Sequence, residues 1–240
     1  MTKGKSEKKD EKNTGNTKED LAEKELSELD EFNPLEEEKQ NWFPLKTLIA
    51  VILGFMIIAM IIPFYAIKLD PEPKKIPSIG EVVPANLDIG NYTRIYSANE
   101  YYKLMNPNDP EIKRIADRIV SYSCDSNKIC QAKALYYFTR NNIIYISDPP
   151  YDYVKSARET LVAKGGDCDD HAVLLANLMQ AIGISTEFVF VPNHVFIRIY
   201  LPEALGKYKI KGTDWINLDP TCNDCDFGQI APEYMKYFKK

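Results

Sequence analysis

Three residues of the chain carry the side chains that a nucleophilic site needs: a thiol, an imidazole and a carboxylate. Cys168, His194 and Asp219 follow one another at separations of 26 and 25 residues. A cysteine thiolate attacks carbonyl carbon, an imidazole moves the proton, and a carboxylate orients the imidazole. Together they can perform acyl transfer through a thioester, provided that the fold brings them into contact.

Cys168 lies where a glycine-rich loop is expected to become a helix. Gly165-Gly166-Asp167 precedes it, and HAVLLANLMQAIG follows, apolar nearly all round. This pattern predicts a buried central helix that starts near Cys168 and stops at Gly183. A thiol at a helix N-terminus lies near the positive end of the helix dipole, which favours the thiolate. The neighbouring carboxylates of Asp167, Asp169 and Asp170 oppose it, unless they point away or bind a cation.

A strand pattern can bring the imidazole to the carboxylate. Period-two alternation after the helix predicts antiparallel strands at Glu187–Val191, Val195–Leu201, Lys207–Lys211 and Trp215–Leu218. If the chain forms a hairpin centred near Leu205–Lys207, His194 lies opposite Asp219 on one face of the sheet. The sequence therefore predicts a general base next to the group that orients it.

Helices are expected before this sheet. Asp109-Pro110 is a helix-start signal followed by isoleucines at helical spacing, and a second helix is expected over Ile129–Thr139. With the helix at Cys168 and the strands after it, the class is α+β, helices first and sheet second.

Composition divides the chain into unlike segments. Lys and Arg number 30 against 35 Asp and Glu, a net charge of −5, which excludes the strongly basic surface of a dedicated nucleic-acid binder. The patterns predict a disordered charged tail over residues 1–44, a transmembrane helix over 45–67, a Pro-rich spacer over 68–90 and a globular domain over 91–240.

The membrane prediction follows from length. Thr47–Ile67 contains no charged residue and would span about 30 Å as a helix, the thickness of a hydrocarbon core. We therefore expect the lipid bilayer as a partner. The lysines that flank the segment slightly oppose a cytoplasmic N-terminus, so cysteine usage decides the expected orientation.

Once these patterns are combined, the chain resembles the transglutaminase-like superfamily, whose fold is papain-like. The resemblance rests on GGDCDDHAVLLANLMQAIGI, NHVFIRIY and WINLDPT, and covers roughly residues 110–222. It implies a Cys-bearing helix packed on an antiparallel sheet, with Cys168 as nucleophile, His194 as general base and then acid, and Asp219 as the orienter of the imidazole.

The resemblance also implies an activity: cleavage or transfer at peptide, isopeptide or glutamine amide bonds of a protein or cell-wall peptide. We expect no cofactor. Two features depart from the family pattern. Val195-Phe196 replaces a small residue followed by Trp, and no Trp precedes Cys168 in the domain to serve as an oxyanion donor. The Cys168 backbone N–H can supply one donor.

The four other cysteines bear on location. Cys124, Cys130, Cys222 and Cys225 are expected to form two disulfides, with three pairings open, or a zinc site inside a cell. Disulfides favour a domain outside the cell and a tail in the cytoplasm.

Other interpretations stay open. His171 is a rival base on the Cys168 helix, and Asp167, Asp169 and Asp170 are candidate calcium ligands. The domain could also be a non-catalytic binding module that keeps the fold, or a redox or zinc module built on Cys222 and Cys225.

Overall fold

The structure is a computed structural model that describes residues 43–91, 94–147 and 153–238. The chain divides into two compact units, residues 1–57 and residues 58–240. The charged tail expected over residues 1–44 lies outside the described residues, except for its last two. These two already belong to the first described helix.

Helix α2, Phe43–Leu69, contains the apolar segment. Its stretch Pro44–Ile62 has a mean hydropathy of 2.7 and none of it is buried. Among the described residues this is the one helix whose length and composition suffice to cross a bilayer. It coincides with the segment in which a transmembrane helix was expected.

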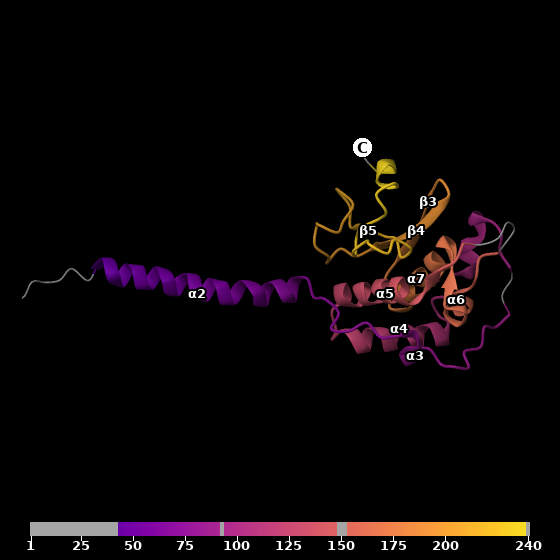
Figure 1. Ribbon diagram of the computed structural model, residues 1–240, viewed down its shortest axis with the longest axis horizontal. Coiled ribbons are helices and arrows are strands. Elements are labelled where there is room, and N and C mark those ends of the chain that lie inside the picture. The colour runs from indigo at the N-terminus through magenta and orange to yellow at the C-terminus, as the bar shows by residue number, and fades with distance from the viewer. Residues whose placement is uncertain (1–42, 92–93, 148–152, 239–240) are drawn as a thin grey trace, which may run out of the picture. The chain divides into compact units, whose positions relative to one another are not determined.

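The globular unit begins with helices, as expected (Figure 1). They are α3 at Ile79–Val82, the 3-10 helix η1 at Ala98–Leu104, α4 at Pro110–Ser123, α5 at Lys128–Asn142 and α6 at Ala157–Ala163. The Asp109 carboxylate caps α4 and the Asn127 amide caps α5, each by accepting backbone N–H groups of the first turn. Both helix predictions are confirmed.

Helix α7, Cys168–Ala181, is the centre of the fold. It packs against strands β3 and β4 on one side and against α4, α5 and α6 on the others (Figure 1). Most of its side chains are fully buried, as a helix apolar all round requires. The helix is followed by Gly183 at φ +79°, a left-handed conformation that glycine adopts without strain.

Two small sheets complete the unit. Strands β3 (Thr186–Val191), β4 (His194–Tyr200) and β5 (Trp215–Leu218) form an antiparallel sheet in the order β3-β4-β5. Strands β1 (Ile144–Tyr145) and β2 (Gly165–Gly166) form a short parallel pair, and a 3-10 turn, η2, lies at Met235–Tyr237. The class is α+β, with the Cys-bearing helix on an antiparallel sheet.

Two details of the expected sheet are wrong. Residues Lys207–Lys211 form turns instead of a strand, because Tyr208 and Lys209 donate their N–H groups to the local carbonyls of Leu205 and Gly206. The register between β4 and β5 pairs Ile197 with Leu218. That register is shifted by two residues from the expected one. A shift by two keeps every side chain on its face, whereas a shift by one would have reversed them.

The segment expected to be a spacer, residues 68–90, lies against the domain. Val82 and Leu87 are part of the hydrophobic core, so the packed unit begins well before residue 91. Asp70, the first residue after α2, accepts hydrogen bonds from Lys133 and Tyr208. The prolines stiffen this segment, while its carboxylates and apolar side chains hold it on the helices.

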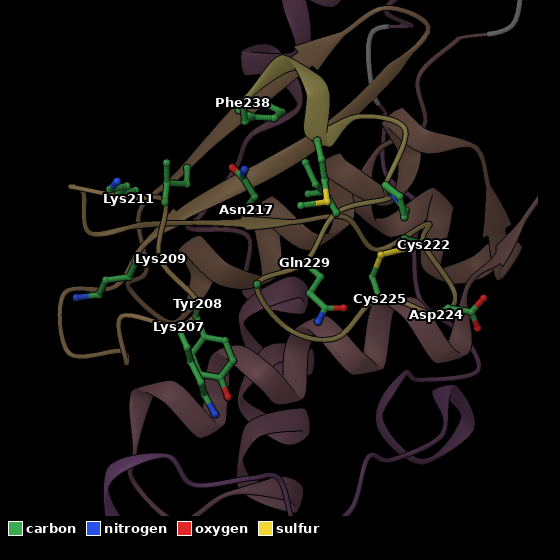
Figure 2. Close-up of a pocket in the computed structure, with 15 residues that line it drawn as sticks. Lys207, Tyr208, Lys209, Lys211, Asn217, Cys222, Asp224, Cys225, Gln229 and Phe238 are labelled. Atoms are coloured by element: carbon green, nitrogen blue, oxygen red, sulfur yellow. A yellow bond between two sulfur atoms is a disulfide. The ribbon is translucent and has the colours of Figure 1, made fainter. Parts of the chain in front are cut away.

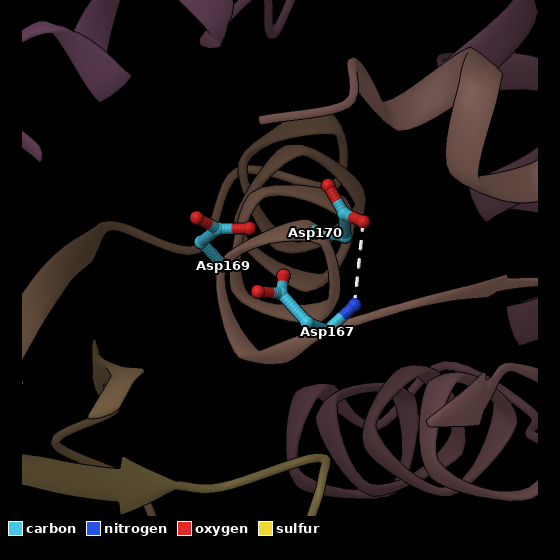
Figure 3. A group of neighbouring side chains, drawn as sticks. All are labelled: Asp167, Asp169 and Asp170. Atoms are coloured by element: carbon cyan, nitrogen blue, oxygen red, sulfur yellow. Dashed lines mark hydrogen bonds between the residues drawn. The ribbon is translucent and has the colours of Figure 1, made fainter. Parts of the chain in front are cut away.

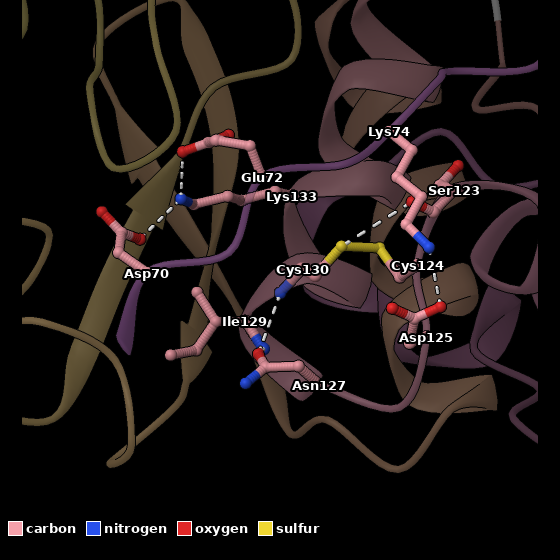
Figure 4. The surroundings of a disulfide bond; sticks show 10 residues. All are labelled: Asp70, Glu72, Lys74, Ser123, Cys124, Asp125, Asn127, Ile129, Cys130 and Lys133. Carbon is pink, nitrogen blue, oxygen red and sulfur yellow. Dashed lines mark hydrogen bonds and ion pairs between the residues drawn. A yellow bond between two sulfur atoms is a disulfide. The ribbon is translucent and has the colours of Figure 1, made fainter. Parts of the chain in front are cut away.

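Lys133 is the main attachment of this segment (Figure 4). Its side chain is 1% exposed, and its ammonium pairs with Asp70 at 2.6 Å and also with Glu72. Burial opposes the charged form, but the bonds to the two carboxylates outweigh this and raise the pKa of Lys133. The charge on the buried lysine is therefore retained and compensated.

The Cys124–Cys130 disulfide closes the loop between the end of α4 and the start of α5. Cys124 and Cys130 are bonded (Figure 4). The Lys74 backbone N–H donates to the Ser123 carbonyl at 2.8 Å. The disulfide therefore holds the turn on which the segment after α2 rests.

We expect Asp70→Ala to destabilise the domain by about 3 kcal/mol, because it leaves the buried Lys133 ammonium without its less exposed partner. Glu72→Ala is the matched control. Its carboxylate is 62% exposed, so the loss should be at most about 1 kcal/mol. Thermal unfolding of the full chain in detergent micelles, followed by tryptophan fluorescence, measures both. Equal losses would show that the two carboxylates contribute equally.

Candidate active site

The approach to Cys168 requires two residues without side chains. A Cβ at Gly165 would lie 2.6 Å from Cδ1 of Ile146 and 3.2 Å from the Ile144 carbonyl oxygen. A Cβ at Gly166 would overlap the Asp170 side chain. The glycine pair thus lets β2 lie beside β1 and turn directly into α7. Cys168 becomes the first residue of that helix, half-buried, with the one free thiol among the described cysteines.

The imidazole and the carboxylate meet as the sequence predicts. Nε2 of His194 lies 2.9 Å from Oδ2 of Asp219, and the two side chains are 8% and 1% exposed. Thr221 donates its backbone N–H and its hydroxyl to Oδ1 of Asp219. Because Nε2 faces Asp219, Nδ1 is the ring nitrogen left for the thiol.

The electrostatics link all three residues. Burial by itself lowers the pKa of His194, but hydrogen bonds to Asp219 and to the Cys168 thiol, with their charges, raise that pKa to about 9. Burial opposes ionisation of Asp219, yet the bonds from His194 and Thr221 keep its pKa below the usual value. His194 is therefore held as an imidazolium at neutral pH, next to both the thiol and the carboxylate.

The three aspartates at the start of α7 differ in their surroundings (Figure 3). Asp170 is fully buried and accepts from the backbone N–H and the ammonium of Lys155 at 2.6 and 2.7 Å. Asp169 accepts from the Tyr101 hydroxyl at 2.9 Å. Burial and the nearby Asp167 raise the pKa of Asp169, so it resists ionisation. The negative charge beside the thiol is thus smaller than three aspartates suggest.

These aspartates are also the candidate calcium ligands. One oxygen from each lies within 4.8 Å of the others, and Oδ1 of Asp167 and Oδ1 of Asp169 have no hydrogen-bond partner in the part of the chain that the structure describes. The Lys155 ammonium already binds Asp170, so the cluster offers few of the six to eight oxygens that Ca²⁺ takes. Calcium binding at these residues stays a prediction.

His171 is placed away from the chemistry. Its side chain is buried, with Nδ1 2.7 Å from the Asp167 carbonyl oxygen and Nε2 3.2 Å from that of Ile143. Both nitrogens face backbone oxygens, so the rival base contacts the loop before α7 and the end of α5.

A cleft of about 540 Å³ opens beside the imidazole. Tyr145, His194, Asp219, Glu233 and Tyr234 are among its lining residues. The Tyr234 ring stacks on the His194 ring, with centroids 4.5 Å apart and planes at 13°. Sequence reasoning missed Tyr234, Tyr101 and Lys155, because no local pattern links them to the three central residues.

The second disulfide, Cys222–Cys225, closes the loop that follows Asp219. The Tyr136 hydroxyl on α5 contacts the carbonyl oxygens of Asp219 and Cys225 at 3.3 and 3.0 Å. The Cys222–Cys225 loop and Asp219 are thereby held on α5. Both disulfides of the domain join cysteines that are close in sequence.

This combination of a thiol at a helix start with a paired imidazole and carboxylate agrees with the comparison with known families. Residues 113–220 match the family model of the transglutaminase-like superfamily. The matched segment covers just under half of the chain. Helix α7, the glycine pair before it and strands β4 and β5 all lie within this segment, whereas Tyr101 and Tyr234 lie outside it.

Two solved structures are similar to the chain. One, from Cytophaga hutchinsonii and described provisionally as a cysteine protease, is 21% identical with a TM-score of 0.36, and the alignment covers 53% of this chain and 43% of that one. The other is the periplasmic domain of TgpA from Pseudomonas aeruginosa bound to ethylmercury, at 19% identity, a TM-score of 0.36 and coverages of 58% and 52%. The chain thus spans about half of each. No curated protein matches it.

The pKa of about 9 for His194 predicts a pH-dependent reactivity of Cys168. Below that pH the imidazolium attracts an anionic reagent, and above it the ring is neutral. We expect the ratio of the alkylation rates with iodoacetate and with neutral iodoacetamide to fall as the pH rises through about 9. In Asp219→Asn the fall should move to lower pH, because the imidazolium loses its charged partner.

Cys168→Ser is the control for labelling of any other thiol, and mass spectrometry of the full chain in detergent gives both rates. A ratio that stays constant with pH, or the same profile in Asp219→Asn, would contradict the coupling of the three groups.

Proposed function

We propose that the chain is a membrane-anchored enzyme that hydrolyses or transfers acyl groups at peptide, isopeptide or glutamine amide bonds. One observation carries the proposal: the bond between His194 and Asp219, formed beside the free thiol at the start of α7. In this proposal Cys168 is the nucleophile, His194 the acid and base, and Asp219 the orienter.

The reaction has two steps. In the first, the Cys168 thiolate adds to the amide carbonyl, and the tetrahedral intermediate collapses as Nδ1–H of His194 protonates the departing nitrogen. This leaves a thioester on Sγ and releases an amine or ammonia. In the second, neutral His194 takes a proton from water or an amine, which attacks the thioester and regenerates the thiolate. Water gives hydrolysis and an amine gives transfer.

Two local features support this chemistry. Asp219 is nearly fully buried and is fixed by Thr221, so it holds the imidazole in one orientation through both steps. The backbone N–H of Cys168 belongs to the first turn of α7, where N–H groups have no partner within the helix. It is available to bind the oxyanion of the tetrahedral intermediate.

The domain is proposed to lie outside the cytoplasm, with the charged tail inside. Helix α2 has the length and composition of a membrane span, and two disulfides in one domain are typical of oxidising compartments. In this arrangement the substrate is a protein or a cell-wall peptide near the membrane surface.

We expect Cys168→Ala and His194→Ala each to lower kcat/KM by about 10³-fold or more, since each removes a group needed in both steps. The assay follows release of ammonia and incorporation of an alkylamine with a glutamine-containing peptide, using the full chain in detergent. Intact-mass spectrometry tests for the acyl group on Cys168. Lys128→Ala, an exposed lysine at the start of α5, is the control for handling. Full activity in Cys168→Ala would reject the mechanism.

The orientation is tested with membrane vesicles of known sidedness. A membrane-impermeant maleimide added to the non-cytoplasmic side should label Cys168. The same reagent added to the cytoplasmic side should label Cys168 only after detergent has opened the vesicles. Cys168→Ser gives the background. Labelling from the cytoplasmic side of sealed vesicles would reverse the proposed orientation.

A further inference from the structure

A second cavity, of about 530 Å³, lies on the face of β5 that points away from α7 (Figure 2). Its walls come from the turns at residues 207–211, from Asn217 on β5, and from the C-terminal segment between Cys222 and Phe238. Ile210, Ile230, Pro232, Met235 and Phe238 make much of the lining apolar. A volume of this size is typical of sites for small molecules or for a few peptide residues.

Asn217 is the exceptional residue of this cavity. It is 8% exposed, and its Oδ1 atom is buried and has no hydrogen-bond partner among the described residues. Its strand neighbours Ile216 and Leu218 point to the core, so Asn217 points to the opposite face, where Figure 2 shows it at the cavity. An unpaired buried carbonyl costs stability, and a leucine of similar size would not. A ligand that donates an N–H to Oδ1 would give this polar residue a function.

Three lysines and one acidic residue, Asp224, line the cavity. Lys207, Lys209 and Lys211 lie along one wall. Lys207 pairs with Asp70 and Lys209 with Asp214. Within the described part of the chain Lys211 is exposed and forms no ion pair, so it is available for an anionic group on a ligand.

The cavity adjoins the cleft at His194. Cys222, Asp224 and Pro232 line both. The disulfide loop that follows Asp219 therefore separates the two sites by the thickness of one chain segment. A peptide bound across this loop can place one residue in the cleft and another in the cavity.

We propose that this cavity is a substrate subsite for a peptide segment that carries a carboxylate. Oδ1 of Asn217 accepts a backbone N–H of the peptide, the Lys211 ammonium pairs with the carboxylate, and the apolar wall receives a neighbouring side chain. This inference rests on the proposed function only in taking the peptide to be a substrate. It assigns a substrate class, acidic peptides, to that function.

Binding is tested in the full chain in detergent with Cys168→Ala, so that no turnover interferes. The probes are the fluorescein-labelled peptide Ala-Leu-Ala-Glu-Ala, amidated at its C-terminus, and the same peptide with Gln in place of Glu. Fluorescence anisotropy gives both affinities. We expect the Glu peptide to bind at least about tenfold more tightly, and Lys211→Ala to abolish that difference. Lys128→Ala, with an exposed lysine far along the sequence from the cavity, should preserve it.

Asn217→Leu separates a binding role from a structural one. If Asn217 serves a ligand, the leucine variant loses affinity for both peptides by at least about tenfold and its melting temperature rises, because a buried unpaired carbonyl has been removed. A lower melting temperature together with unchanged affinity would assign Asn217 to the fold and overturn the subsite. Equal affinities for the two peptides in the chain that carries Cys168→Ala alone would overturn the acidic preference.

Failure here is distinguishable from failure of the enzymatic proposal. Peptide binding requires no reaction at Cys168, whereas formation of the acyl-enzyme requires no carboxylate on the peptide. An acyl-enzyme with both peptides and no binding preference would reject the subsite alone. A preference that depends on Lys211, with no acyl-enzyme, would retain the subsite and reject the chemistry.

Discussion

The burial of α7 is the constraint on which the rest of the structure depends. A helix that is apolar on all sides must be covered on all sides, so the sheet covers one face and α4, α5 and α6 cover the others. Its first residue, Cys168, then lies beside His194, the first residue of β4. The same packing energy that forms the core therefore sets the distance between thiol and imidazole.

Most of the carboxylates around the start of α7 have a compensated charge or a raised pKa. Asp170 is buried but paired with Lys155, Asp219 is buried but paired with His194, and Asp169 has a raised pKa. An unpaired charge at such positions would be strongly unfavourable. The result is an imidazolium beside the thiol in a region that contains four carboxylates, because Asp170 and Asp219 are paired with cationic groups and Asp169 resists ionisation.

The sheet carries different chemistry on its two faces. Ile216 and Leu218 pack into the core, while Asn217 faces the outer side. The C-terminal segment closes over that side by stacking Tyr234 on His194 and placing Phe238 against Phe196. The disulfide loop after Asp219 borders both cavities, so the chain beyond the family's matched segment shapes the surroundings of the site.

The sequence alone determined which residues could react and which elements carry them. The glycine pair, the apolar run after Cys168 and the period-two strands are local patterns, and they predicted α7, the sheet faces and the meeting of His194 with Asp219. The register differed by two residues, which alternation tolerates because the side-chain period is two. Only the tertiary structure decided the partners that are distant in sequence: Lys155 on Asp170, Tyr101 on Asp169, Tyr234 on His194 and Asp70 on Lys133. These contacts form when whole elements dock, and no periodicity along the chain encodes which surface a loop will meet.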